Sequence, residues 1–250
     1  MAEVTLDRDE QIAIVTLRAP RRRNALTGSM VHELLDICEA IDADPAIGAV
    51  VIRAEGASFC AGADRAMLDE AGRDPSSSEN YEALSLAYRA FVRVGQLQPP
   101  TIAAVRGHAV GAGVNLMLAT DLRVVAQTAR IMPGFHHIGL HPGGGHFLLL
   151  GRLAGREAAA ALSVFGQQID GQRAVELGLA WEALPEAEVE PRAIELAREA
   201  GRDPELARAT VRSFRLELGP PAVPWQVALE AERAPQMWSL RRRAQQPGDP

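Results

Sequence analysis

Apolar and polar positions follow two different patterns along this chain, and the change between them divides it. In the first half, short β-branched and apolar runs predict strands, and stretches with apolar residues three or four positions apart predict helices. The runs at 4–6 and 12–17 predict the two strands of a hairpin. The other elements expected here are strands at 49–53, 101–105 and 122–126, and helices at 27–42, 78–96 and 114–120.

After Phe147 the pattern is mostly helical. Helices separated by Gly or Pro are expected at 156–164, 171–178, 186–200, 204–217 and 224–240. Strand–helix alternation followed by helices predicts an α/β core with a helical C-terminal region. We expect the core at 1–195, the helical region at 196–243 and a disordered tail at 244–250.

Composition narrows the classes of function. The 250 residues are 47% hydrophobic and 23% charged, as in ordinary globular proteins, and the net charge of −6 gives a nucleic-acid role no support. All 26 basic residues are arginine, which excludes a Schiff-base or Walker-type lysine. No apolar run is long enough to span a bilayer, and the N-terminus does not resemble a signal peptide. With two cysteines outside any metal-binding spacing, we expect a cytoplasmic protein and no metal site.

Two stretches of small residues are the strongest candidates for chemistry. In 58–64 and again in 107–115, a short apolar strand leads into glycine and alanine. Small side chains let a ligand approach the main chain, and the start of a helix offers unpaired N–H groups. Two such N–H groups aimed at one carbonyl oxygen would form an oxyanion hole.

Motifs in a fixed order carry a resemblance to a known family. The chain resembles the enoyl-CoA hydratase/isomerase (crotonase) family over nearly its whole length. The matching motifs are RNAL at 23–26, FCAGAD at 59–64, AVRGHAVGAG at 104–113, ATDLR at 119–123, GLHPGGG at 139–145 and AVELGLA at 174–180.

This resemblance implies a fold, an assembly and a substrate. The fold would be a crotonase-like (ClpP/crotonase) spiral of ββα units, assembled as a homotrimer or as a hexamer made of two trimers. The substrate would be an acyl-CoA or enoyl-CoA thioester, with coenzyme A as part of the substrate and no permanently bound cofactor, in fatty-acid metabolism. The oxyanion N–H groups would be those of Ala63 and Ala112. The residues implied near coenzyme A are Arg22, Arg23, Ala25, Cys60, Ala61 and Asp64. Taken without the resemblance, the arginines form a solvated run of charge, and Asp64 is structural or faces solvent.

The chain departs from the family where the acid–base residues should lie. Family hydratases place one glutamate three residues after the second oxyanion N–H, where this chain has Asn115. They place the other seven residues before the proline of the glycine-rich loop at 139–145, the third glycine loop, where this chain has Phe135. Neither side chain can take a proton from water.

Histidines are the replacement candidates, because four of the six fall between residues 136 and 146. His141 and His146 are our candidates for an acid or base, and the alternative is that they only brace the loop by hydrogen bonds. Two hypotheses therefore stay open: an enzyme of this family running an atypical reaction, and a non-catalytic acyl-CoA-binding homologue.

Overall fold

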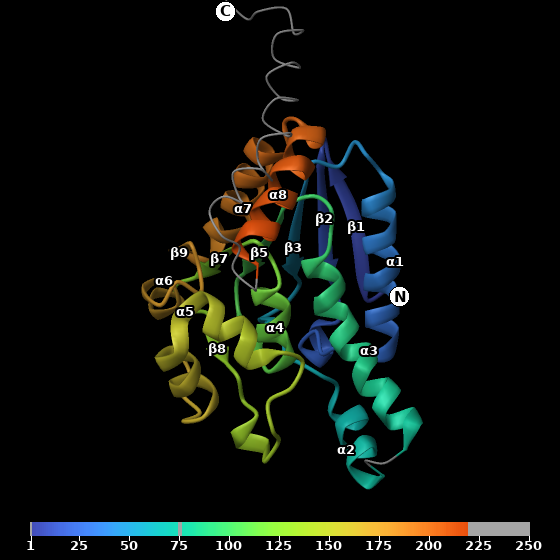
Figure 1. The fold of residues 1–250 in the computed structure, drawn as a ribbon, viewed down its shortest axis with the longest axis vertical. Helices are drawn as coiled ribbons and strands as arrows, with labels where there is room; N and C mark the ends of the chain where they lie inside the picture. Colours follow the sequence, from blue (N-terminus) through green and yellow to red (C-terminus); the bar gives the residue numbers. More distant parts are fainter. Residues whose placement is uncertain (1, 75–76, 220–250) are drawn as a thin grey trace, which may run out of the picture.

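The computed structural model describes residues 2–74 and 77–219. Within them, a six-stranded sheet has the strand order β1-β2-β3-β5-β7-β9 (Figure 1). β1 and β2 form the expected antiparallel hairpin, and the other neighbouring pairs are parallel. The strands are β1 Val4–Asp9, β2 Ile12–Leu17, β3 Ala49–Ala54, β5 Thr101–Val105, β7 Leu122–Ala126 and β9 Glu182–Leu184.

The central strands form the core because their sequences are continuous apolar runs. Every residue of β2 and β5 is buried, and β3 and β7 each leave one residue half-buried. Strands covered on both faces take this composition, since neither face meets water. The hydrophobic pattern therefore predicted these strands to within a residue or two.

A second, smaller sheet turns the chain into a spiral. Its three parallel strands are β4 Ser58–Cys60, β6 His108–Val110 and β8 Arg130–Met132. Three times in succession the chain passes through a strand of the large sheet, then a strand of the small sheet, then a helix. This arrangement confirms the expected α/β spiral of ββα units.

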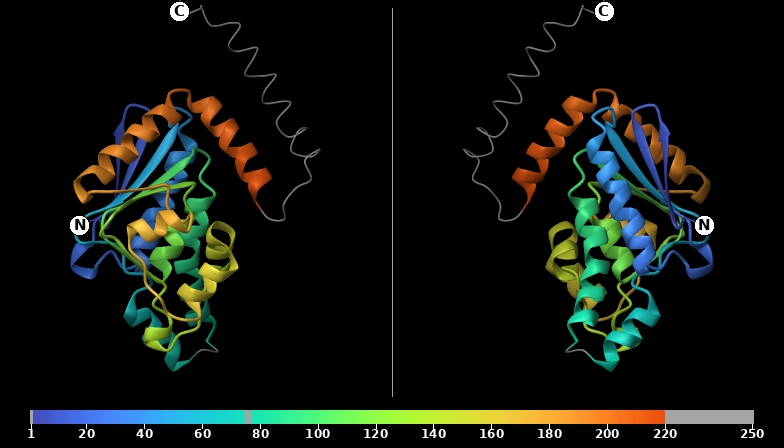
Figure 2. Two further views of the ribbon diagram at one scale, coloured as in Figure 1. Left: turned by 90° about the vertical axis from the view of Figure 1, so that its left-hand side faces the viewer. Right: turned by 90° about the vertical axis from the view of Figure 1, so that its right-hand side faces the viewer.

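Helices cover both faces of the large sheet. α7 lies across one face, and α1 and α3 lie side by side on the other (Figure 2). Thr27 caps α1 and Ser77 caps α3, so both helices begin within a residue of their predicted starts. The helices are α1 Gly28–Ala43, α2 Arg65–Arg73, α3 Ser78–Gly95, α4 Ala112–Leu118, α5 His146–Ser163, α6 Gly171–Glu176, α7 Glu186–Gly201 and α8 Pro204–Leu218, with 3-10 turns η1 Pro20–Arg22 and η2 His136–Ile138.

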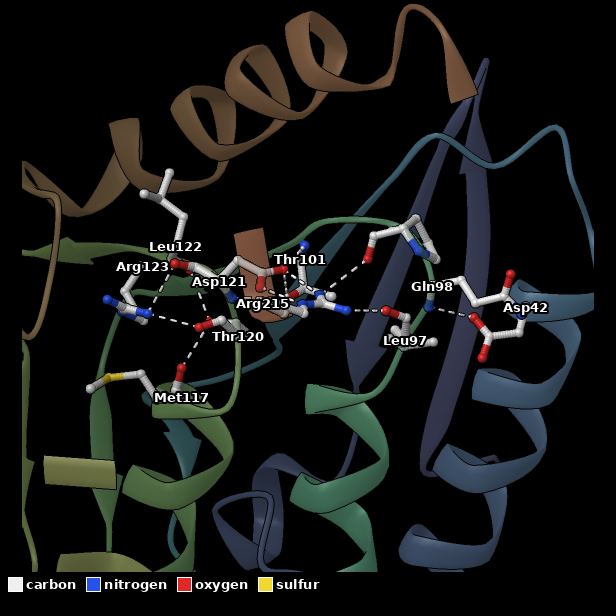
Figure 3. A network of polar contacts seen from close by, with 11 residues as sticks. Asp42, Leu97, Gln98, Thr101, Met117, Thr120, Asp121, Leu122, Arg123 and Arg215 are labelled. Carbon is white, nitrogen blue, oxygen red and sulfur yellow. Dashed lines mark hydrogen bonds and ion pairs between the residues drawn. The ribbon is translucent and has the colours of Figure 1, made fainter. Parts of the chain in front are cut away.

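α8 is fastened to the rest of the fold by a polar network (Figure 3). The carboxylate of Asp121 accepts hydrogen bonds from the main-chain N–H and the hydroxyl of Thr101, both at 2.8 Å. Arg215 of α8 donates from Nε to the same carboxylate at 2.7 Å and from another guanidinium nitrogen to the carbonyl of Leu97. This network joins α8 to the start of two strands of the large sheet.

Several elements differ from the sequence prediction, chiefly where they are short. α2, β6, β8 and β9 were not predicted, and α4 begins at Ala112 rather than at residue 114. α5 begins at His146, ten residues before the predicted helix, and Gly155 interrupts it with non-helical angles. Strands of three residues show no measurable alternation, which explains why periodicity missed them.

The predicted domain limits stay predictions. Residue 195 lies inside the continuous helix α7, while the expected helix at 224–240 and tail at 244–250 lie outside the described residues. Among the helices that the structure describes, none is both long and apolar enough to cross a bilayer.

Candidate functional site

Main-chain contacts bring the two small-residue stretches together. A side-chain carbon at Gly62 would lie 2.7 Å from the carbonyl oxygen of Val110 and 3.2 Å from the nitrogen of Ala112. A side-chain carbon at Gly113 would lie 2.1 Å from the carbonyl oxygen of Cys60. Only glycine permits such approaches, so the end of β4 and the start of α4 touch backbone to backbone.

The N–H groups of Ala63 and Ala112 are unpaired at this contact. Among the described residues, neither donates a hydrogen bond, although the neighbouring N–H of Asp64 donates to Leu26 at 3.2 Å. Both alanines are half-buried. Ala112 follows Gly111, whose φ of 55° and ψ of −119° suit glycine and turn the chain into α4. Two unpaired N–H donors on adjoining segments could both donate to one carbonyl oxygen, which is the arrangement of an oxyanion hole.

The loop before α1 lies against the first of these segments. The carbonyl of Arg23 accepts a hydrogen bond from the N–H of Ala61 at 2.9 Å. Asn24, fully buried with a φ of 53°, donates from Nδ2 to the carbonyls of Glu55 and Ser58. The expected coenzyme A residues of this loop therefore adjoin those of 60–64.

The arginines of this loop differ in their availability. Both Arg22 and Arg23 are exposed. Arg22 forms an ion pair with Glu3. The guanidinium of Arg23 has no partner among the residues described. Arg23 is thus the better placed of the two to meet an anionic group.

Three of the expected coenzyme A residues have defined environments of their own. Ala25 is buried and Cys60 is fully buried, and burial raises the pKa of the Cys60 thiol to about 12. The carboxylate of Asp64 accepts hydrogen bonds from the N–H groups of Ala66 and Met67, at 3.0 and 3.3 Å, and so caps α2. The carboxylate of Asp64 therefore stabilises the start of α2, which agrees with the structural role given above as the alternative.

Asn115, Phe135 and His146 form one cluster. His146, 1% exposed at the start of α5, places Nδ1 2.6 Å from Oδ1 of Asn115. Nδ2 of Asn115 donates to the carbonyl of Gly143 at 3.1 Å. The ring of Phe135 meets the imidazole edge-on, with centroids 5.0 Å apart. The two positions that lack carboxylates thus both contact the same histidine.

Burial makes His146 a neutral imidazole. It lowers the pKa of His146 from 6.5 to about 4. Nε2 is buried and has no hydrogen-bond partner among the described residues. A buried polar atom without a partner is rare in native structures, so this nitrogen needs an explanation.

The other histidines of the loop are exposed. His141 lies near its own neighbour, with Nδ1 2.6 Å from the carbonyl oxygen of Pro142, and its ring centroid is 6.1 Å from that of Phe147. His136 and His137 lie in the turn η2. The structure thus brings His146, and none of these three, into contact with Asn115.

Sequence reasoning missed the contribution of α3. Tyr88 and Phe91 pack against the third glycine loop, where side-chain carbons at Gly143 and Gly144 would lie 2.4 Å from the Tyr88 hydroxyl and 2.5 Å from the Phe91 ring. Burial, with a smaller contribution from Tyr81, raises the pKa of the Tyr88 phenol, which keeps it protonated. The helical spacing of α3 shows that both residues share a face, but not which loop that face meets.

Charged and coordinating side chains do not gather here. Within the described ranges, no group of three His, Cys, Asp or Glu residues could hold a metal ion. The chemistry available at the site is that of main-chain N–H groups, one amide side chain, one neutral imidazole and aromatic rings.

Comparison with known proteins relates this chain to enoyl-CoA hydratases in both sequence and structure. The chain matches the family model described as enoyl-CoA hydratase/isomerase over residues 7–236. A probable enoyl-CoA hydratase of Mycobacterium tuberculosis is 41% identical over 177 residues, covering 71% of this chain and 68% of that protein. One of Rhodobacter capsulatus is 35% identical over 225 residues, covering 89% and 84%. The crystal structure of an enoyl-CoA hydratase from Polaromonas sp. JS666 superposes with a TM-score of 0.86 at 27% identity, covering 95% of this chain and 91% of that one.

Proposed function

Because this chain belongs to the enoyl-CoA hydratase/isomerase family, we propose that it binds an acyl-CoA thioester and polarises the thioester carbonyl with the N–H groups of Ala63 and Ala112. The observation that carries the proposal is the backbone contact at Gly62, which sets two unpaired donors on adjoining segments. Negative charge that develops on the carbonyl oxygen would be held by both donors at once.

The coenzyme would lie along the loop before α1. Arg23 is the candidate for a coenzyme A phosphate, because its guanidinium is exposed and has no partner among the described residues. The segment 60–64 would meet the coenzyme through its main chain, since the Cys60 thiol is buried and the Asp64 carboxylate caps α2. Arg22 could bind the ligand only by breaking its ion pair with Glu3.

Assembly is part of the same proposal. We expect a homotrimer or a dimer of trimers. Large apolar side chains are exposed along η2 and α5 and just after the end of α5, which supports association. The most exposed of them are Ile138, Phe147, Leu148, Val164 and Phe165.

The proposed polarisation is tested by removing one donor. Ala112 is the first residue of α4, a position where proline is tolerated because its N–H has no helical partner. In Ala112→Pro, we expect the infrared carbonyl frequency of a bound, isotope-labelled acyl-CoA to move back towards its value in water. If the ester is turned over, kcat/KM should fall by roughly 100- to 1000-fold.

The matched control is Ala112→Gly, which keeps the N–H and should keep the shifted frequency. The result that contradicts the proposal is an ester that binds to the folded proline variant with its carbonyl frequency unchanged.

A second candidate function is acyl-CoA binding without catalysis. It is favoured by Asn115 and Phe135, neither of which can take a proton. A series of trans-2-enoyl-CoA esters separates the two candidates. Loss of enoyl absorbance or migration of the double bond supports an enzyme, whereas tight binding across the series without either supports a binding protein.

A further inference from the structure

A cavity of about 410 Å³ lies between the end of α3 and one face of α8. Residues 95–98 form one wall, and Arg208, Val211, Arg212 and Arg215 form the other. These four residues are three or four positions apart, so they share a face of the helix. None of the residues that line the cavity belongs to the candidate site. Three guanidinium groups around a cavity large enough for a small ligand indicate an affinity for anions.

The carboxylates around this cavity already have cationic partners. Asp121 forms an ion pair with Arg215, and Figure 3 shows the two side chains together. Asp42 accepts the main-chain N–H of Gln98 with one oxygen, at 2.8 Å, and with the other forms an ion pair with Arg93 at 2.6 Å. These acidic groups therefore leave the positive charges of Arg208 and Arg212 to be met by something else.

Arg208 supplies charge to the cavity but no free hydrogen-bond donor. It forms no ion pair with the residues that the structure describes, and it makes five hydrogen bonds, as many as a guanidinium has N–H groups. The acceptors are the carbonyls of Ile41, Asp42, Asp44 and Ile47 and the side-chain oxygen of Gln98. Burial lowers the pKa of Arg208, although the carboxylates of Asp42 and Asp44 oppose this shift. Its positive charge is therefore only partly compensated.

Arg212 supplies the donors that Arg208 lacks. Its side chain lines the cavity, is exposed, and has no hydrogen-bond or ion-pair partner within the described part of the chain. A guanidinium presents two parallel N–H groups that can bind two oxygens of one phosphate. Two positive charges without a carboxylate partner also suit this ligand, because a phosphate monoester carries about 1.5 to 2 negative charges at pH 7.

We propose that this cavity is a second ligand site, which binds a phosphate group through the guanidinium of Arg212 beside the charge of Arg208. The ligand is inorganic phosphate or a small phosphate monoester. Because the walls belong to α8 and to the end of α3, a ligand bound here stabilises the attachment of α8 to the rest of the fold. The site is independent of the proposed function, since it shares no residue with the proposed thioester site.

Calorimetry with inorganic phosphate tests the site, in a buffer otherwise free of phosphate and at constant ionic strength. We expect saturable binding to the wild type and a loss of affinity of at least about tenfold in Arg212→Met, the effect of one charged hydrogen-bonding partner. Arg212→Lys should restore only part of the affinity, because an ammonium group cannot form the two parallel bonds. Without phosphate, Arg212→Met should unfold like the wild type, which separates lost binding from lost folding.

The matched control is Arg23→Met. Arg23 is also an exposed guanidinium without a partner among the described residues, and it is our candidate for a coenzyme A phosphate. This variant should keep the affinity for inorganic phosphate. Succinate should bind to the wild type more weakly than phosphate does, because its charges lie on two separate carboxylates that one guanidinium cannot hold together.

Three results overturn the proposal: no saturable binding of phosphate, equal affinity in Arg212→Met and the wild type, or succinate that binds as tightly as phosphate. A fall in acyl-CoA affinity in Arg212→Met also overturns it, because the cavity would then belong to the thioester site. A wild type that binds phosphate in this way but binds no acyl-CoA would keep the second site and contradict the proposed function.

Discussion

Three glycines set the distance between main-chain segments around the candidate site. A side-chain carbon at Gly62, Gly107 or Gly113 would come within 2.1 to 2.7 Å of a carbonyl oxygen on the neighbouring segment. Real carbon atoms do not approach oxygen so closely, so any larger residue must push the segments apart. At the scale of the residue, the close contact between these main-chain segments therefore depends on glycine, which has no side chain.

Gly113→Ala tests this geometry. The added methyl would lie 2.1 Å from the carbonyl oxygen of Cys60, and the overpacking should lower the free energy of unfolding by about 1–3 kcal/mol. Acyl-CoA affinity should fall as well, because α4 must move away from β4. Urea unfolding and calorimetry measure the two effects.

Gly151→Ala is the matched control within α5. Beyond its own helix and chain neighbours, no atom of the described residues lies within 4 Å of its added methyl, and alanine there should raise stability by up to about 1 kcal/mol. If the two variants behave alike, the close approach at Gly113 does not matter.

His146 should make stability depend on pH. Its pKa is lowered by burial from 6.5 to about 4, so the unfolded chain binds a proton that the folded chain refuses between these values. The stabilisation is fully present above pH 6.5 and is lost as pH falls towards 4, by up to about 3 kcal/mol. Urea unfolding in steps from pH 7.5 to pH 4 measures the slope.

The comparison variant is His146→Gln, which removes the titrating group. Carboxylates titrate in both proteins, so only the difference between the two curves reports on His146. If the stability of the two proteins depends on pH in the same way, His146 is protonated as readily in the folded chain as in the unfolded one, which contradicts the prediction.

At the scale of the element, α8 is held by arginines that bind the ends of other elements. Arg208 donates to the carbonyls of Ile41, Asp44 and Ile47, at 3.1, 2.7 and 3.1 Å, around the end of α1. A cation suits the carbonyl end of a helix, where the last oxygens lack partners. Arg215 makes the equivalent attachment at Asp121 (Figure 3).

Arg215→Met should weaken this attachment. The carboxylate of Asp121 would keep its two bonds from Thr101 but lose its cation while mostly buried, at a cost of about 1–3 kcal/mol in the free energy of unfolding. Thermal and urea unfolding measure the loss.

Arg212→Met on the same helix is the control. Arg212 is exposed and forms no ion pair with the described residues, so the change should stay within about 0.5 kcal/mol. Equal effects at 212 and 215 would contradict a specific role for the Asp121 network.

At the scale of the whole molecule, the spiral decides what meets at the site. Successive turns stack parallel strands, so β4 and β6 end at the same edge of the small sheet, and the stretches that follow them face each other. The unpaired N–H groups of Ala63 and Ala112 come from two different turns. Neither turn could form this arrangement alone.

The same scale explains what the sequence could predict. Strands such as β2 and β5 were predictable because both faces are covered and the runs are wholly apolar. The pairing of Asn115 with His146 was not, because it joins residues 31 positions apart through the packing of α4 on α5. Motif spacing pointed to Asn115 and the clustering of histidines pointed to His146, and only the folded chain shows that the two side chains touch.

The contact at Gly62 also bears on how such a protein can evolve. Its donors belong to the peptide backbone, so exchange of neighbouring side chains leaves them in place as long as the glycines remain. Under the proposed function, the capacity to polarise a carbonyl is then inherited with the backbone, whereas side chains such as Asn115 and Phe135 are free to change. A protein with the proposed function could thereby change its reaction and still bind a thioester.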